Sequence, residues 1–294
     1  MRKVLKWIGI GLGSLIVLLL IAGFTMYLIG GSKLNQTYAV HTADLVIPTD
    51  SASLVRGAHL ARINGCTDCH GPDLSGQVFV DAPPFRVVAA NLTAGAGGIG
   101  RTYTAEDWDR TIRHGVKPDG KPVFIMPSAA FHRLSDEDTA ALIAYLQQVP
   151  AVDHDLPPTE IRTPGRLMAA GPLDVAMEVR TEPARSSRPP IGPTADYGEY
   201  LASGVCAYCH GEGLLGAQPA TPGSPPAPSL VAAGQWSLDE FTTTLRTGTT
   251  PGGRTLDPEF MPVAFTSQYD STEYRALHAY LETLQGGIQT ASDS

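Results

Sequence analysis

The sequence predicts a mainly α-helical protein in which one N-terminal transmembrane helix is followed by two tandem helical domains. Three observations support this fold class: a long uncharged apolar stretch near the N-terminus, a residue pattern that occurs twice, and apolar residues at helical spacing in both copies. We find no run of alternating apolar and polar residues that would indicate a strand. At 294 residues the chain has room for about two domains.

The uncharged apolar stretch extends from Trp7 to Ile29, which is long enough to span a bilayer as a tilted helix. Arg2, Lys3 and Lys6 precede it, whereas only Lys33 follows it closely. The positive-inside bias therefore puts the N-terminus in the cytoplasm and the remainder outside. The competing interpretation is a cleaved signal peptide, but its apolar core should span only about 7–15 residues. We expect an uncleaved anchor.

The repeated pattern defines two domains of similar construction. Gly57 corresponds to Gly198, and the last segment of each copy contains Ala-Leu-x-Ala-Tyr-Leu, at 141–146 and 276–281. Serines followed by acidic residues indicate helix N-termini before these segments. We expect these parts: cytoplasmic stub and anchor, 1–31; extracytoplasmic linker, 32–50; first domain, 51–150; proline-rich linker, 151–194; second domain, 195–287; disordered tail, 288–294.

All four cysteines of the chain lie in two Cys-x-x-Cys-His motifs: Cys66, Cys69 and His70, then Cys206, Cys209 and His210. A structural zinc site usually takes two Cys-x-x-Cys pairs about 15–20 residues apart, and it does not explain a histidine after both pairs. A redox-active disulfide would need a βαβ context that the sequence lacks. The motif is instead typical of c-type haem, with two thioether bonds to the cysteines and iron bound by the histidine. We therefore expect two covalently bound c-type haems.

A second iron ligand is indicated at the same place in each copy. Met126 and Met261 align in the repeat, and a proline follows each of them. A thioether suits Fe(II), and Met/His ligation raises the haem potential. The alternative is a methionine that fills a gap in the core. We expect His70 and Met126 to ligate one iron, and His210 and Met261 the other.

Four further residues align between the copies and are candidate haem contacts: Trp108 with Phe241, and Arg113 with Arg246. An arginine can bind a haem propionate through two parallel hydrogen bonds. The alternative for the arginines is a solvated helix face.

Each copy resembles a class I cytochrome c domain, through Cys-x-x-Cys-His, the Met-Pro pair and the closing Ala-Tyr-Leu helix. The first half, from "NLTAGAGGIG" to "DLPPTEIRTPGRL", is also similar to cytochrome subunits of membrane-bound alcohol and gluconate dehydrogenases. Those subunits typically carry three haem motifs, whereas this chain has two. The size and single anchor are similar to the dihaem subunit of haem–copper oxidases, without its Trp-rich segment. In class I cytochromes a proline carbonyl often accepts the proton of the axial histidine, which implies Pro228.

The resemblance implies a dihaem electron carrier, or an electron-transfer subunit of a dehydrogenase or oxidase complex, with no substrate chemistry of its own. We expect it in the cytoplasmic (inner) membrane with the haem domains on the periplasmic side. The expected partners are the lipid bilayer and redox proteins: a dehydrogenase, a quinol-oxidising complex, a soluble cytochrome or an oxidase. A dihaem peroxidase is the rival enzyme, but it needs an exchangeable iron site, against which two aligned methionines argue. A redox or gas sensor is a third class, but no signalling domain follows the haem motifs.

Charge adds one expectation about partners. The net charge of −8 at pH 7 argues against nucleic-acid binding, which needs a basic surface. Residues 195–294 carry three basic and eleven acidic residues, so the acidity belongs to the second domain. This acidity favours either solubility or docking of a basic partner, and the sequence leaves both open.

Overall fold

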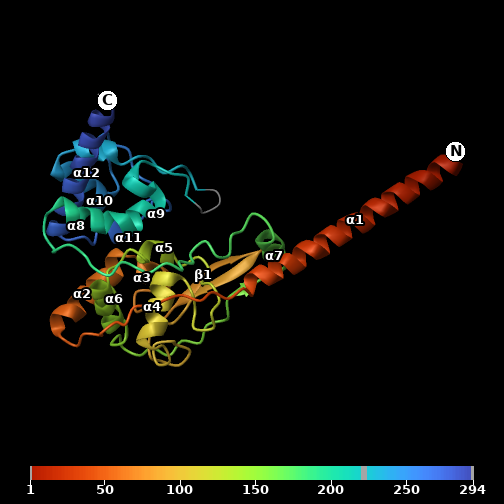
Figure 1. Ribbon diagram of the computed structural model, residues 1–294, viewed down its shortest axis with the longest axis horizontal. Coiled ribbons are helices and arrows are strands. Elements are labelled where there is room, and N and C mark those ends of the chain that lie inside the picture. The colour runs from red at the N-terminus through yellow and green to blue at the C-terminus, as the bar shows by residue number, and fades with distance from the viewer. Residues whose placement is uncertain (1, 220–223, 293–294) are drawn as a thin grey trace.

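The computed structural model describes residues 2–219 and 224–292. The long helix α1 (Arg2–Leu34) projects from a body in which two helical domains lie one above the other (Figure 1). Helix α1 is the one helix in the described part of the chain that is long and apolar enough to cross a membrane, by length and composition. By these two criteria, α1 agrees with the transmembrane helix expected from the sequence.

The first domain contains five helices: α2 (Ser51–Ile63), α3 (Cys66–His70), α4 (Ala105–His114), α5 (Ser128–Phe131) and α6 (Asp136–Leu146). The second domain repeats this order with α8 (Ala195–Leu201), the π-helical turn η1 (Ala202–Cys206), α9 (Ala207–His210), the 3₁₀ turns η2 (Glu212–Leu214) and η3 (Val231–Gln235), α10 (Leu238–Thr247), α11 (Val263–Thr266) and α12 (Ser271–Ser292). Thus the repeat in the sequence is a repeat in the fold.

Helix caps begin the equivalent helices at equivalent positions. Thr104 and Asp107 form a capping box at the start of α4, and Ser237 and Glu240 form the matching box at α10. At the start of α6, the side chain of Ser135 accepts a hydrogen bond from the backbone N–H of Asp138. These side chains satisfy backbone donors that the first helical turn leaves free.

A glycine lets the first and last helices of each domain touch backbone to backbone. A Cβ at Gly57 in α2 would overlap the carbonyl oxygen of Ala141 in α6, and a Cβ at Gly198 in α8 would overlap that of Ala276 in α12. Any larger residue would push the helices apart. The glycines that align in the sequence therefore hold the same helix crossing in both domains.

The prediction that the chain has no strands is wrong for the first domain. Strands β1 (Gln77–Ala82), β2 (Phe85–Ala89) and β3 (Glu160–Ile161) form a small antiparallel sheet in that order. A bulge between Val78 and Val80 breaks the alternation in β1, and β3 comes from a distant part of the chain. Both features hide the strands from a search for period-two patterns.

The proline-rich segment 151–194 lies against the first domain instead of hanging free between the domains. It supplies β3 and the helix α7 (Thr163–Ala169), which packs on the end of α1 (Figure 1). Ala169 and Glu178 of this segment are 0% and 2% exposed. Helix α12 continues to Ser292, so the segment 288–292 is helical where a disordered tail is expected; residues 293 and 294 lie outside the described residues.

Candidate haem sites and the interface between them

The first Cys-x-x-Cys-His motif forms the short helix α3, which follows α2 after a two-residue turn. Gly65, just before Cys66, has a φ of 70° and so turns the chain in a conformation that favours glycine. The Nδ1 atom of His70 lies 2.8 Å from the carbonyl oxygen of Ala90. Because a carbonyl can only accept, Nδ1 carries the proton and Nε2 keeps the lone pair that a metal needs. Burial lowers the pKa of His70, which keeps this imidazole neutral.

The second motif is built in the same way on α9. His210 is 7% exposed, and its Nδ1 lies 2.7 Å from the carbonyl oxygen of Pro228, the residue that the resemblance implied. Sequence reasoning did not find the counterpart in the first domain, Ala90. The signal was present: "AANL" at 89–92 aligns with "APSL" at 227–230, and both leucine amides bond to the leucine that follows the haem motif, Leu74 or Leu214.

The four cysteines are half-buried thiols whose surroundings do not favour thiolates. Burial raises the pKa of Cys66 and of Cys206 to about 12, and it also raises the pKa of Cys69 and of Cys209. A thiolate is the form that binds zinc and attacks a disulfide, and apolar burial suppresses it. The two pairs also belong to separate domains, so they do not form one four-cysteine site.

The two methionines occupy matching positions. Met126 and Met261 each stand one residue before a proline that begins a one-turn helix, α5 or α11. Both methionines are half-buried, and Met126 packs against the core. Each short helix is fixed to the end of the preceding long helix: Ser128 Oγ donates to Thr111 O at 3.0 Å, and Thr266 Oγ1 donates to Leu245 O at 2.8 Å. Their ligation of iron remains a prediction.

Trp108 and Phe241 are core residues of their domains. Trp108 is 2% exposed and meets Tyr103 edge to face at 5.3 Å, and Phe241 is 5% exposed and lies 5.5 Å from the ring of His278. The indole Nε1 of Trp108 is buried and has no hydrogen-bond partner among the described residues. A buried donor without a partner is costly, so an acceptor on a haem would fit there.

The two aligned arginines have different surroundings. Arg113 is fully buried, pairs with Asp109, and lies 2.7 Å from Asp136, so two carboxylates already balance its charge. Its Nη2 has no partner among the described residues. Arg246 is exposed, and its guanidinium lies 5.0 Å from the ring centroid of Tyr274. The repeat in sequence therefore does not give these two arginines one common role.

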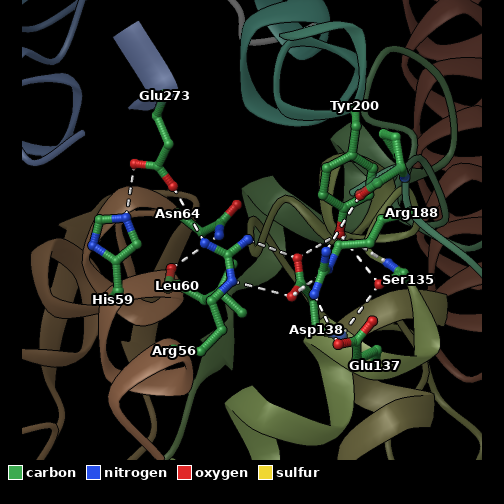
Figure 2. Close-up of polar contacts among 11 residues, drawn as sticks. Arg56, His59, Leu60, Asn64, Ser135, Glu137, Asp138, Arg188, Tyr200 and Glu273 are labelled. Carbon is green, nitrogen blue, oxygen red and sulfur yellow. Dashed lines mark hydrogen bonds and ion pairs between the residues drawn. The ribbon is translucent and has the colours of Figure 1, made fainter. Parts of the chain in front are cut away.

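A buried ionic network joins the two domains (Figure 2). Arg56 of α2 lies 2.8 Å from Asp138 of α6 and 3.2 Å from Glu273 of α12. Arg188 of the connecting segment lies 3.2 Å from the same Asp138. Both acidic side chains are 1% exposed. Their ion pairs and hydrogen bonds offset the free-energy cost of removing these carboxylates from water.

The network follows the internal repeat. His59 of the first domain contacts Glu273 of the second, and Tyr200 of the second domain donates to Asp138 of the first at 2.8 Å. In the repeat His59 corresponds to Tyr200, and Asp138 corresponds to Glu273. The domains therefore meet through equivalent surfaces, as two subunits do around a two-fold axis.

The same pseudo-symmetry brings the haem motifs to the interface. A Cβ at Gly65, just before the first motif, would lie 3.3 Å from the ring of Phe265 in α11. A Cβ at Gly204, two residues before the second motif, would lie 3.3 Å from the carbonyl oxygen of Ala130 in α5. The segment just before each haem motif thus lies close to the helix that follows the other domain's methionine.

Sequence reasoning missed one buried acid that contacts both domains. Glu178 lies in the segment interpreted as a linker. Its Oε2 accepts the amide of Ala129 at 2.9 Å, three residues after Met126, and its Oε1 accepts the hydroxyl of Tyr208 at 2.5 Å. Tyr208 stands between Cys206 and Cys209. Burial, followed by the hydrogen bond to Glu178, raises the pKa of Tyr208.

Comparison with known protein families agrees with this geometry. The family "Cytochrome c" matches residues 54–150, and the family "Cytochrome C oxidase, cbb3-type, subunit III" matches residues 193–281. The chain therefore contains two cytochrome c domains, one around each haem motif. It holds two c-type haems, for which Cys66/Cys69 and Cys206/Cys209 fit as attachment sites.

Three individual proteins that are similar to this chain are cytochrome subunits or cytochromes. The "Alcohol dehydrogenase (quinone), cytochrome c subunit" of Gluconacetobacter polyoxogenes is 29% identical over 86% of this chain and 59% of its own length. The "Fructose dehydrogenase cytochrome subunit" of Gluconobacter japonicus is 28% identical over 79% and 52%, respectively. The "Diheme cytochrome c-type" of Cereibacter sphaeroides is 26% identical over 90% and 97%. The chain thus spans little more than half of the dehydrogenase subunits and nearly all of the dihaem cytochrome.

Proposed function

We propose that this protein is a membrane-anchored dihaem cytochrome c that passes single electrons from a redox partner at the membrane to another carrier or to an oxidase. One observation carries the proposal: the two haem motifs lie in equivalent environments on the two sides of a single interface. Electron tunnelling slows steeply with distance, so haems at a shared interface can exchange electrons within the chain. The protein supplies ligands, dielectric and docking surfaces, and the haem supplies the redox chemistry.

We propose His70 and Met126 as the iron ligands of the first haem, and His210 and Met261 as those of the second. The support is the free Nε2 of each histidine and the matching positions of the methionines before α5 and α11. Ligation from both sides leaves no open iron position, which suits electron transfer rather than peroxide chemistry.

The proposed location is the cytoplasmic (inner) membrane, with α1 as a single span and the haem domains on the periplasmic side. Packing supports an anchor that stays attached over a signal peptide that is removed. Gly30 and Gly31 of α1 are buried against Arg166 of α7, and the hydroxyl of Tyr27 accepts a 2.7 Å hydrogen bond from Arg166. These contacts make the end of α1 part of the folded first domain.

Two kinds of working partner fit this function, and the relatives support both equally. As a free carrier, the protein would exchange electrons with a quinol-oxidising complex, a soluble cytochrome or an oxidase. As a subunit, it would accept electrons from a catalytic dehydrogenase, as the names of the relatives from Gluconacetobacter and Gluconobacter suggest. Purification from native membranes under mild detergent separates them, because only a subunit would bring a stoichiometric catalytic chain with it.

An optical redox titration of the detergent-solubilised holoprotein tests the proposal. Two low-spin transitions at high potential are expected from two Met/His haems. One high and one very low transition, together with hydrogen peroxide turnover, would overturn it in favour of a dihaem peroxidase.

A further inference from the structure

We propose that the cavity between the end of α1 and α7 binds the phosphodiester headgroup of an anionic phospholipid. The cavity has a volume of about 700 Å³. Tyr27 and Leu28 line it on the side of the apolar span, and Ser32, Gln36, Thr37 and Arg166 provide polar groups. The inference rests on the proposed membrane placement of α1 and adds a ligand to it.

The cavity lies at the height where headgroups are found. The apolar span ends at Ile29, and the polar lining begins three residues later at Ser32. An α-helix rises about 1.5 Å per residue, and each headgroup layer is roughly 5–7 Å thick. Ser32 to Thr37 therefore lie within or just above that layer. Leu28, 55% exposed, continues the apolar surface of α1 down towards the acyl chains.

Arg166 is the group that would bind the phosphate. Its guanidinium lies 4.6 Å from the ring centroid of Tyr27, and Nη1 donates to the hydroxyl of Tyr27 at 2.7 Å. Within the described residues no carboxylate lies at ion-pair distance from Arg166, unlike Arg56, Arg113 or Arg162. An arginine has five N–H donors in a fork that matches two phosphate oxygens. Among the described residues, Nη1 is the one nitrogen of the Arg166 guanidinium with a hydrogen-bond partner.

Further cations surround the cavity. The ammonium group of Lys121 lies 3.3 Å from the amide oxygen of Asn35, which also lines the cavity, and Lys33 stands in the last turn of α1. The end of a helix carries a partial negative charge that opposes an anion, so these cations are needed for binding. Hydroxyls of Ser32 and Thr37 add neutral donors. This set of groups recognises a phosphate diester.

The same polar groups could bind inorganic phosphate, but the apolar side of the cavity, next to the membrane span, favours a lipid. Tyr27 and Leu28 offer surface to an acyl chain and nothing to a free ion. We therefore take phosphatidylglycerol as the test ligand, and phosphatidylcholine and inorganic phosphate as comparisons.

The experiment is lipid titration of the full-length holoprotein in detergent, with bound lipid counted by native mass spectrometry. The variants are Arg166→Gln and Ser32→Leu, which replaces a polar lining group by a bulky apolar one and leaves Arg166 in place. The matched control is Arg275→Gln, an exposed arginine of α12 that has no ion pair among the described residues. Helix α12 belongs to the second domain, away from α1 and α7 (Figure 1). Phosphatidylglycerol should bind Arg166→Gln about fivefold more weakly than wild type, since one arginine near a membrane contributes about that factor.

Binding that is weakened in both cavity variants and unchanged in Arg275→Gln supports the site. Wild-type binding by either cavity variant, equal weakening in the control, or displacement of the lipid by an equal concentration of inorganic phosphate overturns it. Haem spectra and reduction potentials should match wild type in every variant. A loss of lipid is therefore distinguishable from a failure of the electron-transfer function, which would appear in those potentials.

Discussion

The side chains of His59 and Glu273 meet across the domain boundary, with His59 Nε2 2.8 Å from Glu273 Oε2 (Figure 2). The second half of the same interface replaces this histidine–acid pair by the phenol–acid pair of Tyr200 and Asp138. Arg56 bridges the two acids. A single arginine thus forms an ion pair with one carboxylate from each domain, and Arg188 provides a second positive charge beside Asp138.

Replacing Asp138 should loosen the two domains. Asp138→Asn leaves Arg56 paired with Glu273 alone and Arg188 paired with Glu137 alone. Removing one partner from a buried ion pair costs about 3–5 kcal/mol of unfolding free energy, and because both arginines keep a second partner we expect about 3 kcal/mol. Thermal unfolding of the holoprotein measures this. The control is Glu137→Gln on the same helix: Glu137 also pairs with Arg188, but its side chain is 71% exposed, so less than about 1 kcal/mol should be lost. Equal effects of the two changes would contradict the buried-network account.

Acid should separate the domains. Burial alone raises the pKa of Asp138, but the hydrogen bond and charge of Arg56, with Tyr200 and Arg188, lower it below the usual 3.8. A lowered folded-state pKa means that this stabilisation is complete above the unfolded pKa and is lost as pH falls through the folded value. The free energy of unfolding should therefore drop below about pH 4. In Asp138→Asn that part of the drop should be missing, and a curve identical to wild type would refute this origin.

Replacing a proposed methionine ligand should lower one haem potential and keep the haem attached. Met261→Ala should lower the second transition by on the order of hundreds of mV, within the roughly 0.8 V range that axial ligands set. Met126→Ala should do the same for the first. Met168→Ala, a methionine of α7 outside both motifs, serves as control. An unchanged titration in Met261→Ala would remove that residue as a ligand.

Neutralising Glu178 should raise the haem potentials. A buried carboxylate stabilises the more positive ferric haem, and Glu178 touches both Tyr208 of the second haem motif and Ala129 beside the first methionine helix. Glu178→Gln keeps the shape and removes the charge, so we expect an upward shift on the order of tens of mV. Glu182→Gln, on the same segment with a side chain 59% exposed, should shift far less. No difference between these variants would show that Glu178 acts on packing alone.

Electron transfer to a basic partner should slow as salt rises. Eight net negative charges lie between residues 195 and 294, and exposed charges are screened beyond about 10 Å at 0.1 M salt. Stopped-flow oxidation of the reduced protein by a basic soluble cytochrome checks this. An acidic soluble cytochrome is the control, and its rate should rise with salt. A flat response with the basic partner would leave solubility as the reason for the acidity.

The parts of the fold that were predictable are those with local signals. The apolar span, the capped helices and the duplicated haem motif each lie in a short stretch of sequence. The missed parts depend on distant contacts. Strand β3 pairs Ile161 with Phe85, and Ala90 acts only through its backbone carbonyl, which no side-chain pattern marks. Glu178 was missed because its proline-rich surroundings suggest a linker, whereas tertiary contacts bury it between α5 and the second haem motif.

The close packing of Gly30 and Gly31 against α7 has a consequence for how the protein meets its partners. A flexible linker after the membrane span would let the haem domains rotate freely and present any face to a partner. With α1 in the membrane as proposed, its packing against α7 would restrict the height and tilt of the first domain above the lipid surface. The protein would then meet a second membrane protein by diffusion in the membrane plane and by rotation about the membrane normal. Soluble carriers could not dock on the faces that point towards the lipid.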